Sequence, residues 1–391
     1  MKTVRVAVIG VGNIGTTHAL QIGQDRISGM QLVACCDTAP QRREFISKEL
    51  PMIPVYEDYW QVLSRQDVDA VVIAVPHPVH DKIAIAAFES GKHVLVEKPV
   101  AVSVTAAQRM NAAAKKAGTV FGVMLNQRTN PLFAKARDLV KSGQLGQIKR
   151  SVWLVTNWYR TQAYYDSGAW RATWSGEGGG VLLNQAPHNL DLWQWICGMP
   201  TAITGYCDIG RHHNIETEDD ATIFAQYENG ATGTFIVSTG EYPGTNRLEI
   251  SGTLGKIVLE DGVLKWWRLE QSYEEAQKYS KECSLDMPTT YQEFTQEQPE
   301  SGHAGILQNF ADCILKGTPL LAPGQEGLLE LTISNATYLS AWKGNVSIEL
   351  PFDGIEFDAL LKNHIEQSSG KVAASYCGEI VDYLKRWKTN W

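Results

Sequence analysis

The sequence lacks the features of a membrane protein or a disulfide-bonded one. No apolar run among its 391 residues approaches the length that crosses a bilayer, although 44% hydrophobic residues suffice for two buried cores. The seven cysteines are odd in number, irregularly spaced and free of any Cys-x-x-Cys motif. This pattern argues against a disulfide framework and a structural zinc site and indicates reduced thiols.

The sequence shows no basic patch, and we expect no leader segment. The first residues lead directly into an apolar strand, so we expect no signal peptide and a cytoplasmic protein. The net charge of −8 is spread along the chain, and no basic stripe appears. Neither nucleic acid nor a membrane is therefore an expected partner.

Two groups of metal-binding or redox residue types follow no recognisable spacing. His212 and His213 lie near several carboxylates, but we interpret them as part of a solvated loop and expect no metal site. Cys35 and Cys36 lie inside an apolar stretch, where we expect them to pack rather than to act in redox chemistry.

A glycine-rich turn follows the first apolar stretch. The expected strand Val4 to Ile9 runs into Gly10, Gly12 and Gly15, and helix-forming residues come next. Such glycines permit a tight turn, close approach of the backbone to a pyrophosphate, and close helix packing. The alternative is a glycine turn without a ligand. The turn's context in a strand and a helix favours dinucleotide binding.

The acid that ends the second expected strand selects between the two nicotinamide dinucleotides. Leu32 to Cys36 is followed by Asp37, which stands where a ribose 2′-hydroxyl would bind. A 2′-phosphate would meet repulsion from this carboxylate, so NAD is favoured over NADP. Arg42 lies close enough in sequence to keep NADP as the alternative.

Apolar strands alternate with amphipathic helices up to about residue 126 and then give way to longer strands of alternating polarity. The alternation predicts a doubly wound parallel sheet in residues 1–126. In residues 127–391 the stretches Ala221 to Tyr227 and Gly233 to Ser238, joined by a turn, indicate an antiparallel hairpin. We therefore predict an α/β protein with a second, α+β domain built on an open, mainly antiparallel sheet. We expect the polar residues 271–302 to form a surface loop or insertion.

Aromatic and arginine side chains crowd the segment before a triple glycine at 178–180. Aromatic faces stack on pyranose rings, and guanidinium groups donate to hydroxyls or carboxylates. The segment therefore predicts a sugar-binding wall, with domain packing or an oligomer contact as the alternative for any single residue. The candidate wall residues are Tyr159, Arg160, Tyr164, Tyr165, Trp170, Arg171 and Trp174.

Three motifs together resemble the glucose–fructose oxidoreductase, inositol dehydrogenase and MocA (Gfo/Idh/MocA) family. They are the glycine turn, the stretch from Gly91 to Glu97-Lys98-Pro99, and the triple glycine followed by His188 and Asp191. The resemblance covers most of the chain. It implies a nicotinamide cofactor in the first domain, and oxidation or reduction of a sugar or polyol in the cleft between the domains.

Lys98 and His188 are the catalytic candidates. Lys98 follows an apolar strand at the carboxyl end of the expected sheet, where desolvation lowers a lysine's pKa enough for proton exchange with a hydroxyl. His188 opens a helix on which we expect Asn184 and Asp191 to share its face, Asp191 orienting the imidazole and Asn184 binding the substrate. Many family members carry aspartate where this chain has Asn184, which leaves the proton transfer to Lys98 and His188.

The resemblance extends to the cofactor site, with one departure. His80 matches the histidine of the family's Pro-Asn-x-x-His turn, but His77 stands where asparagine is usual, and residues 126–128 are expected to border the nicotinamide. The expected cofactor-binding residues are Gly10, Gly12, Asn13, Ile14, Gly15, Asp37, Pro76, His80, Glu97, Lys98, Asn126 and Gln127.

These observations predict an NAD-dependent enzyme that oxidises or reduces a ring hydroxyl or carbonyl, such as that at C3, of a sugar or glycoside. A homo-oligomer formed through the C-terminal sheet is expected. Two alternatives stay open: an NAD-dependent glycosidase that works by transient oxidation and elimination, and a non-catalytic NAD-binding protein.

Overall fold

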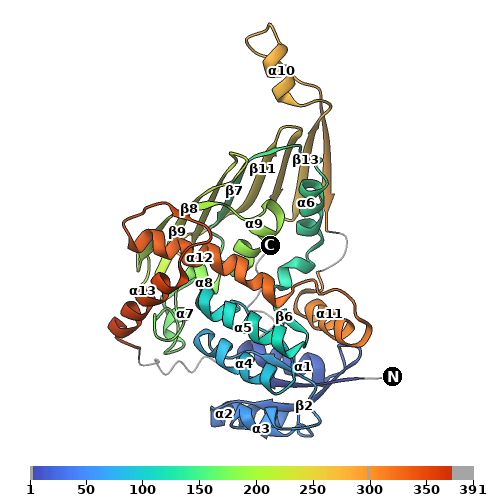
Figure 1. Cartoon of the computed structure of the whole chain (residues 1–391), viewed down its shortest axis with the longest axis vertical. Coiled ribbons are helices and arrows are strands. Elements are labelled where there is room, and N and C mark those ends of the chain that lie inside the picture. The colour runs from blue at the N-terminus through green and yellow to red at the C-terminus, as the bar shows by residue number, and fades with distance from the viewer. Residues whose placement is uncertain (1–2, 297–299, 372–391) are drawn as a thin grey trace.

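In the computed structural model, residues 3–296 and 300–371 are described. Residues 297–299, which belong to the expected insertion, and residues 372–391 lie outside this range. Within it, two sheets are joined through a layer of helices, and an arm projects from the far end (Figure 1). No helix in the described part of the chain has the length and apolar character needed to cross a membrane.

The first sheet is parallel, with six strands in the order β3-β2-β1-β4-β5-β6. Its central strands are buried along almost their whole length because helices cover both faces. This confirms the predicted doubly wound sheet. The strands are β1 (Val4–Ile9), β2 (Met30–Cys36), β3 (Val55–Tyr56), β4 (Ala70–Ile73), β5 (His93–Val96) and β6 (Phe121–Val123). The helices are α1 (Asn13–Gly23), α2 (Pro40–Glu49), α3 (Tyr59–Leu63), α4 (His80–Glu89) and α5 (Val104–Ala117).

The second sheet has nine strands in the order β14-β13-β12-β11-β7-β10-β9-β8-β15, and all pairs are antiparallel except β10 with β7. The predicted hairpin is present as β9 and β10, paired with Gly233 opposite Ala225. The mainly antiparallel sheet is thus confirmed. The strands are β7 (Ile148–Val155), β8 (Ala202–Ile209), β9 (Glu218–Gln226), β10 (Thr232–Ser238), β11 (Asn246–Gly252), β12 (Gly255–Glu260), β13 (Val263–Leu269), β14 (Thr289–Thr295) and β15 (Ile348–Glu349).

Helices pack on one face of the second sheet and connect it to the first. Trp193 on α9 stacks on Phe235 of β10, and α12 packs along β8. Segments late in the chain return to the first sheet, where Gly122 of β6 bridges to Pro323 and α11 contacts β1. The helices are α6 (Pro131–Lys141), α7 (Gln162–Asp166), α8 (Val181–Asn184), α9 (Pro187–Cys197), α11 (Gly302–Lys316), α12 (Gly327–Trp342) and α13 (Gly354–Gln367).

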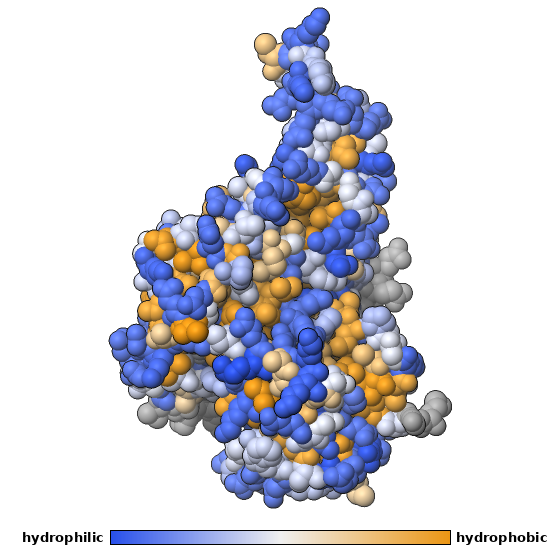
Figure 2. All heavy atoms as spheres, viewed as in Figure 1, coloured by the Kyte–Doolittle hydropathy of each residue, from blue (hydrophilic) through white to orange (hydrophobic). Residues whose placement is uncertain are grey.

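The segment expected to be a surface loop, 271–302, contains regular structure. It forms helix α10 (Tyr273–Tyr279) and the strand β14, which pairs with β13 at the sheet edge. Exposed polar side chains dominate it, and Figure 2 shows the projecting arm as mostly hydrophilic. The polar composition correctly indicated exposure. The strand was missed because its partner, β13, satisfies its backbone while almost all of its side chains face solvent.

Candidate active site

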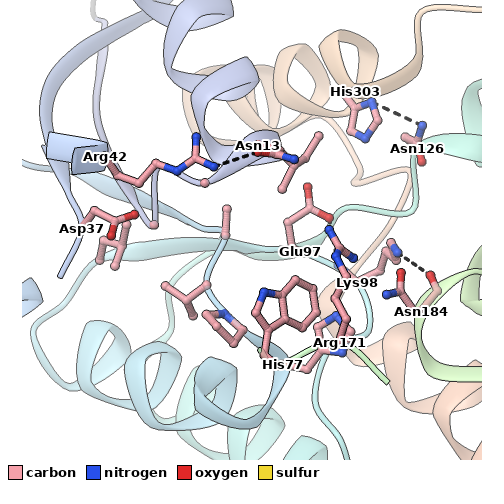
Figure 3. A pocket seen from close by; sticks show the side chains of 18 of the residues that line it. Asn13, Asp37, Arg42, His77, Glu97, Lys98, Asn126, Arg171, Asn184 and His303 are labelled. Carbon is pink, nitrogen blue, oxygen red and sulfur yellow. Dashed lines mark hydrogen bonds between the residues drawn. The ribbon is translucent and has the colours of Figure 1, made fainter. Parts of the chain in front are cut away.

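A cavity of about 930 Å³ lies where the first sheet meets the helices of the second domain. Figure 3 shows it running from Asp37 and Arg42 at one end to Lys98, Arg171 and Asn184 at the other. Parallel sheets place ligands beyond the carboxyl ends of their strands, and this cavity follows that rule. The sequence-predicted residues lining it are Gly10, Gly12, Asn13, Ile14, Asp37, Pro76, Glu97, Lys98, Asn126, Gln127, Arg160, Tyr164, Trp170, Arg171, Asn184 and His188.

The glycine turn has the shape that a dinucleotide needs. A Cβ on Gly10, whose φ is +88°, would lie 2.4 Å from the Ala74 carbonyl oxygen, and one on Gly15 would lie 1.8 Å from the Gly10 oxygen. A Cβ on Gly12 would instead enter open space at the cavity wall. Since no described side chain caps the start of α1, its first N–H groups are available to an anion. The turn fits a bound pyrophosphate.

Asp37 is held in place directly after β2. Its two carboxylate oxygens each accept a 2.8 Å hydrogen bond from a backbone N–H, those of Val11 and Ala39. The guanidinium of Arg42 donates to the Asn13 side chain over 3.1 Å at the same end of the cavity (Figure 3). The carboxylate is therefore fixed against the glycine turn, where a ribose would bind.

Glu97 and Lys98 directly follow β5, and both line the cavity. Burial opposes the charge on Glu97, but the hydrogen bond from His18 Nε2, 2.7 Å away, and the positive charges nearby lower the pKa of Glu97 to about 2. Burial lowers the pKa of Lys98, while nearby carboxyl groups, Glu177 among them, oppose this shift. Lys98 Nζ donates to the backbone oxygen of Asn184 over 2.7 Å, which ties the cofactor domain to α8.

Asn184 and His188 both line the cavity but do not share a helix. Asn184 is the last residue of α8, whereas His188 is the second residue of α9, which begins at Pro187. Proline has no N–H to continue the first helix, so the chain restarts there. Burial, followed by repulsion from Lys98 and His303, holds the pKa of His188 well below 6.5. The imidazole is neutral at pH 7.

Asp191 does not orient His188, contrary to expectation. Its carboxylate is engaged by Arg128 through two hydrogen bonds of 2.6 and 2.8 Å, and Gln194 donates a third. Both members of the ion pair are buried, and neither lines the cavity. Arg128 was expected beside the nicotinamide, but it is drawn inward by this carboxylate and by Glu326.

The aromatic segment splits between the cavity and the core. Trp170 and Arg171 line the cavity, and Arg160 stacks over the ring of Tyr164, which lines it too. Tyr165 and Trp174 are buried instead, and the Tyr165 hydroxyl lies 2.8 Å from the hydroxyl of Thr239. Tyr159 is 44% exposed and lies against Tyr242, outside the cavity lining.

His80 does not line the cavity, contrary to expectation, whereas His77 does. His80 is buried outside the cavity lining, with its ring nitrogens 2.9 and 2.8 Å from the carbonyl oxygens of Pro99 and Val75. His77 lines the cavity, and its Nδ1 lies 3.2 Å from the carbonyl oxygen of Glu177. His80 thus braces the segment that carries Lys98.

Sequence reasoning missed two residues at this site. His303 opens α11 and lines the cavity beside Asn126, but nothing local links it to a glycine turn nearly 300 residues earlier. Glu177, directly before the triple glycine, hydrogen-bonds Asn184, and an acid within an aromatic segment was the available signal.

The loop around His212 and His213 is ordered by Asp219. This carboxylate accepts backbone hydrogen bonds from Arg211, His212 and His213 and lies 2.8 Å from His213 Nδ1. Within residues 3–296 and 300–371, no cluster of histidine, cysteine and acidic side chains is arranged to hold a metal ion. Cys35 is buried in β2, and burial raises the pKa of its thiol to about 12.

Comparison with known proteins assigns both halves of the chain. Residues 4–125 match the model of the oxidoreductase family with an NAD-binding Rossmann fold, and residues 133–258 match the GFO/IDH/MocA C-terminal domain. The chain belongs to the Gfo/Idh/MocA family. It is an NAD-binding oxidoreductase of this family, as the resemblance of its motifs implied.

Relatives within the Gfo/Idh/MocA family include polyol and sugar enzymes. A scyllo-inositol 2-dehydrogenase (NAD(+)) of Bacillus subtilis is 27% identical over 329 residues, 81% of this chain and 88% of that enzyme. The WlbA dehydrogenase of Bordetella pertussis, solved with NADH and UDP-GlcNAcA, superposes with a TM-score of 0.75 at 26% identity, covering 90% of this chain and 100% of that one. A levoglucosan dehydrogenase shares the fold, with a TM-score of 0.75 at 21% identity, over 90% of this chain and 100% of that chain.

The position of Asp37 predicts a preference between cofactors. We expect NAD to bind at least about tenfold more tightly than NADP, a difference of about 1.4 kcal/mol. Titration of the purified protein with each dinucleotide measures this ratio. Equal or tighter binding of NADP would contradict it, and loss of that binding in Arg42→Ala would identify Arg42 as the phosphate partner.

Proposed function

We propose that this protein transfers hydride between NAD and a secondary ring carbon, such as C3, of a sugar, glycoside or cyclitol. The observation that carries the proposal is the hydrogen bond from Lys98 to the Asn184 backbone. It places a buried lysine between the dinucleotide turn and a wall of aromatic and arginine side chains. Oxidation of a hydroxyl requires a proton acceptor at this junction.

The chain's own residues divide the work of the reaction. Bound NAD supplies the acceptor for the hydride that leaves the substrate carbon. Lys98, whose pKa burial lowers, takes the hydroxyl proton at Nζ, and the neutral imidazole of His188 holds the same hydroxyl by a hydrogen bond. The reverse reaction returns the proton from Lys98 to the carbonyl oxygen.

The opposite wall of the cavity suits a polyhydroxylated ring. The guanidinium of Arg171 lies 4.5 Å from the ring centres of both Trp170 and Tyr164 and donates to the Tyr164 hydroxyl over 2.9 Å. Its planar donors are thus fixed before a substrate arrives, which favours a ligand with many hydroxyl groups or a carboxylate.

A substrate panel tests the proposed function. The protein with NAD is offered scyllo-inositol, myo-inositol, levoglucosan, UDP-GlcNAcA and methyl glucosides, while NADH absorbance and products are followed. We expect NADH together with an intact oxidised ring from at least one compound. Release of methanol without net NADH would support the elimination route instead. No change with any compound, despite bound NAD, would contradict both.

We further propose that the protein self-associates through the open face of its nine-stranded sheet. Val152, Tyr206 and Phe224 point outward from β7, β8 and β9, while their neighbours in sequence point into the core. Apolar side chains on an uncovered sheet face are typical of an interface between copies. Light scattering of wild type and Phe224→Glu tests this proposal, which a monomeric wild type would contradict.

A further inference from the structure

Glu177 is a buried carboxyl group directly behind the substrate end of the cavity. Glu177 is 2% exposed and does not line the cavity. One oxygen accepts a hydrogen bond from the Asn184 side-chain nitrogen, and the other accepts the Ala172 N–H over 2.5 Å. A buried carboxyl group is costly unless such partners compensate its charge.

This contact determines which end of the Asn184 amide faces the cavity. An ionised carboxylate can only accept hydrogen bonds, so the amide nitrogen must face Glu177. The same nitrogen lies 3.5 Å from the Tyr164 hydroxyl. The side-chain oxygen of Asn184, to which no described residue donates, is therefore the atom presented to a ligand. Figure 3 shows Asn184 beside Lys98 at this end of the cavity.

We propose that Glu177 is a positioning residue that selects the redox form of the substrate by orienting the Asn184 amide. When Glu177 is ionised, Asn184 presents an oxygen that accepts a hydrogen bond from a substrate hydroxyl. When Glu177 is protonated, it can donate to that oxygen, the amide turns over, and its N–H groups face the ligand and suit a ketone. The inference rests on the proposed function, because only a hydroxyl–carbonyl pair makes the two orientations matter.

Several charged and titratable groups surround Glu177, and together with its burial they set its pKa near neutral pH. Burial raises the pKa of Glu177 to about 7, although the Ala172 N–H, Arg171, Asn184 and Lys98 all favour the ionised form. His77 Nδ1 lies 3.2 Å from the backbone oxygen of Glu177. The negative charge of Glu177 also contributes to the raised pKa of Tyr165 on α7. Because the ionised form binds the alcohol, KM for the alcohol should rise as pH falls through about 7. KM for the ketone should change in the opposite direction.

Moving the carboxylate from position 177 to position 184 tests the inference kinetically. The probe is the panel compound that the NAD-bound wild type oxidises fastest. Glu177→Gln should raise its KM about three- to tenfold at pH 8, the cost of one neutral hydrogen bond, and change kcat less than about threefold. It should also abolish the change in KM between pH 6 and pH 8. The double variant Glu177→Gln with Asn184→Asp again presents a fixed oxygen to the substrate and should recover KM to within about threefold of wild type.

Glu218→Gln is the matched control. Burial also raises the pKa of Glu218 to about 7, but this carboxyl group bonds Gly180, Leu182 and Tyr338 and not Asn184. We expect the control to lower stability and to keep the pH dependence of KM. The inference is overturned if Glu177→Gln leaves KM and its pH dependence unchanged. It is also overturned if kcat falls by orders of magnitude at constant KM, because Glu177 would then act in proton transfer itself.

A second measurement needs no substrate and no variant of Glu177. Infrared difference spectra of the NAD-bound Glu218→Gln protein, recorded across pH, should show a carboxyl group titrating near pH 7. Adding Asn184→Ala removes a donor to the ionised form and should move that titration to higher pH. An unmoved titration, or none, contradicts the inference. Failure of the whole substrate panel with this shift intact would instead count against the proposed function alone.

Discussion

Lys98→Met should lower kcat at least about a hundredfold, the usual scale for loss of a positioned proton-transfer group, while NAD affinity stays near the wild-type value. Methionine is an unbranched side chain only one atom shorter than lysine, and it removes the N–H groups. The substrate hydroxyl then loses its proton acceptor, and the Asn184 backbone oxygen loses its 2.7 Å donor. Steady-state kinetics and a dinucleotide titration on the same preparation separate the two effects.

Lys92→Met provides a matched control for the loss of a buried lysine. Lys92 is also buried, and its Nζ donates to the carbonyl oxygens of Arg65 and Val68, away from the cavity. Its replacement should reduce stability and leave kcat unchanged. Wild-type turnover in Lys98→Met would contradict the catalytic role. Lys98 would then, like Lys92, only donate hydrogen bonds to backbone oxygens.

The pH dependence of the wild type follows from the direction of the Lys98 shift. Burial lowers the pKa of Lys98 from 10.5, so the neutral amine that accepts a proton becomes populated at lower pH than in an exposed lysine. The rate of alcohol oxidation should therefore rise with pH until this group has lost its proton. The residual activity of Lys98→Met should lack this rise.

Most of the cofactor side of the cavity could be predicted from the sequence because its determinants are local. Gly10 and Asp37 directly follow β1 and β2, and Gly12 comes two residues after Gly10. The carboxyl ends of neighbouring parallel strands must meet at one edge. Lys98 stands in the same relation to β5. Strand order and glycine geometry leave these residues few alternative positions, so all of them line the cavity, as the sequence pattern predicts.

The substrate side depends on tertiary partners that no local pattern contains. Tyr164 and Tyr165 are adjacent, and only the packing of Tyr165 against Thr239 and His213 decides that Tyr164 faces the cavity. His303 reaches the site from a helix that follows the projecting arm. Asp191 was paired with the wrong neighbour because helical spacing puts it near His188, whereas Arg128 lies 63 positions away in sequence.

Asp191→Ala should destabilise the fold by about 3–5 kcal/mol, because it leaves the buried guanidinium of Arg128 without its main partner. The Arg128 side chain is fully buried, and Asp191 supplies two of its hydrogen bonds. Its other carboxylate partner, Glu326, is 38% exposed, so solvent screens that contact. Glu326→Ala should accordingly cost no more than about 1 kcal/mol.

Unfolding in urea, measured beside turnover, separates this role of Asp191 from the one that helical spacing suggested. An aspartate that oriented His188 would lower kcat and leave the free energy of unfolding nearly unchanged. If Asp191 instead neutralises Arg128, its loss should lower the free energy of unfolding and leave kcat nearly unchanged under conditions where the variant stays folded. Since Arg128 directly follows Gln127 at the cavity wall and Asp191 lies on the helix that carries His188, the ion pair also holds the two halves of the site together. NAD binding should therefore restore part of the lost stability, because the ligand binds only the folded state.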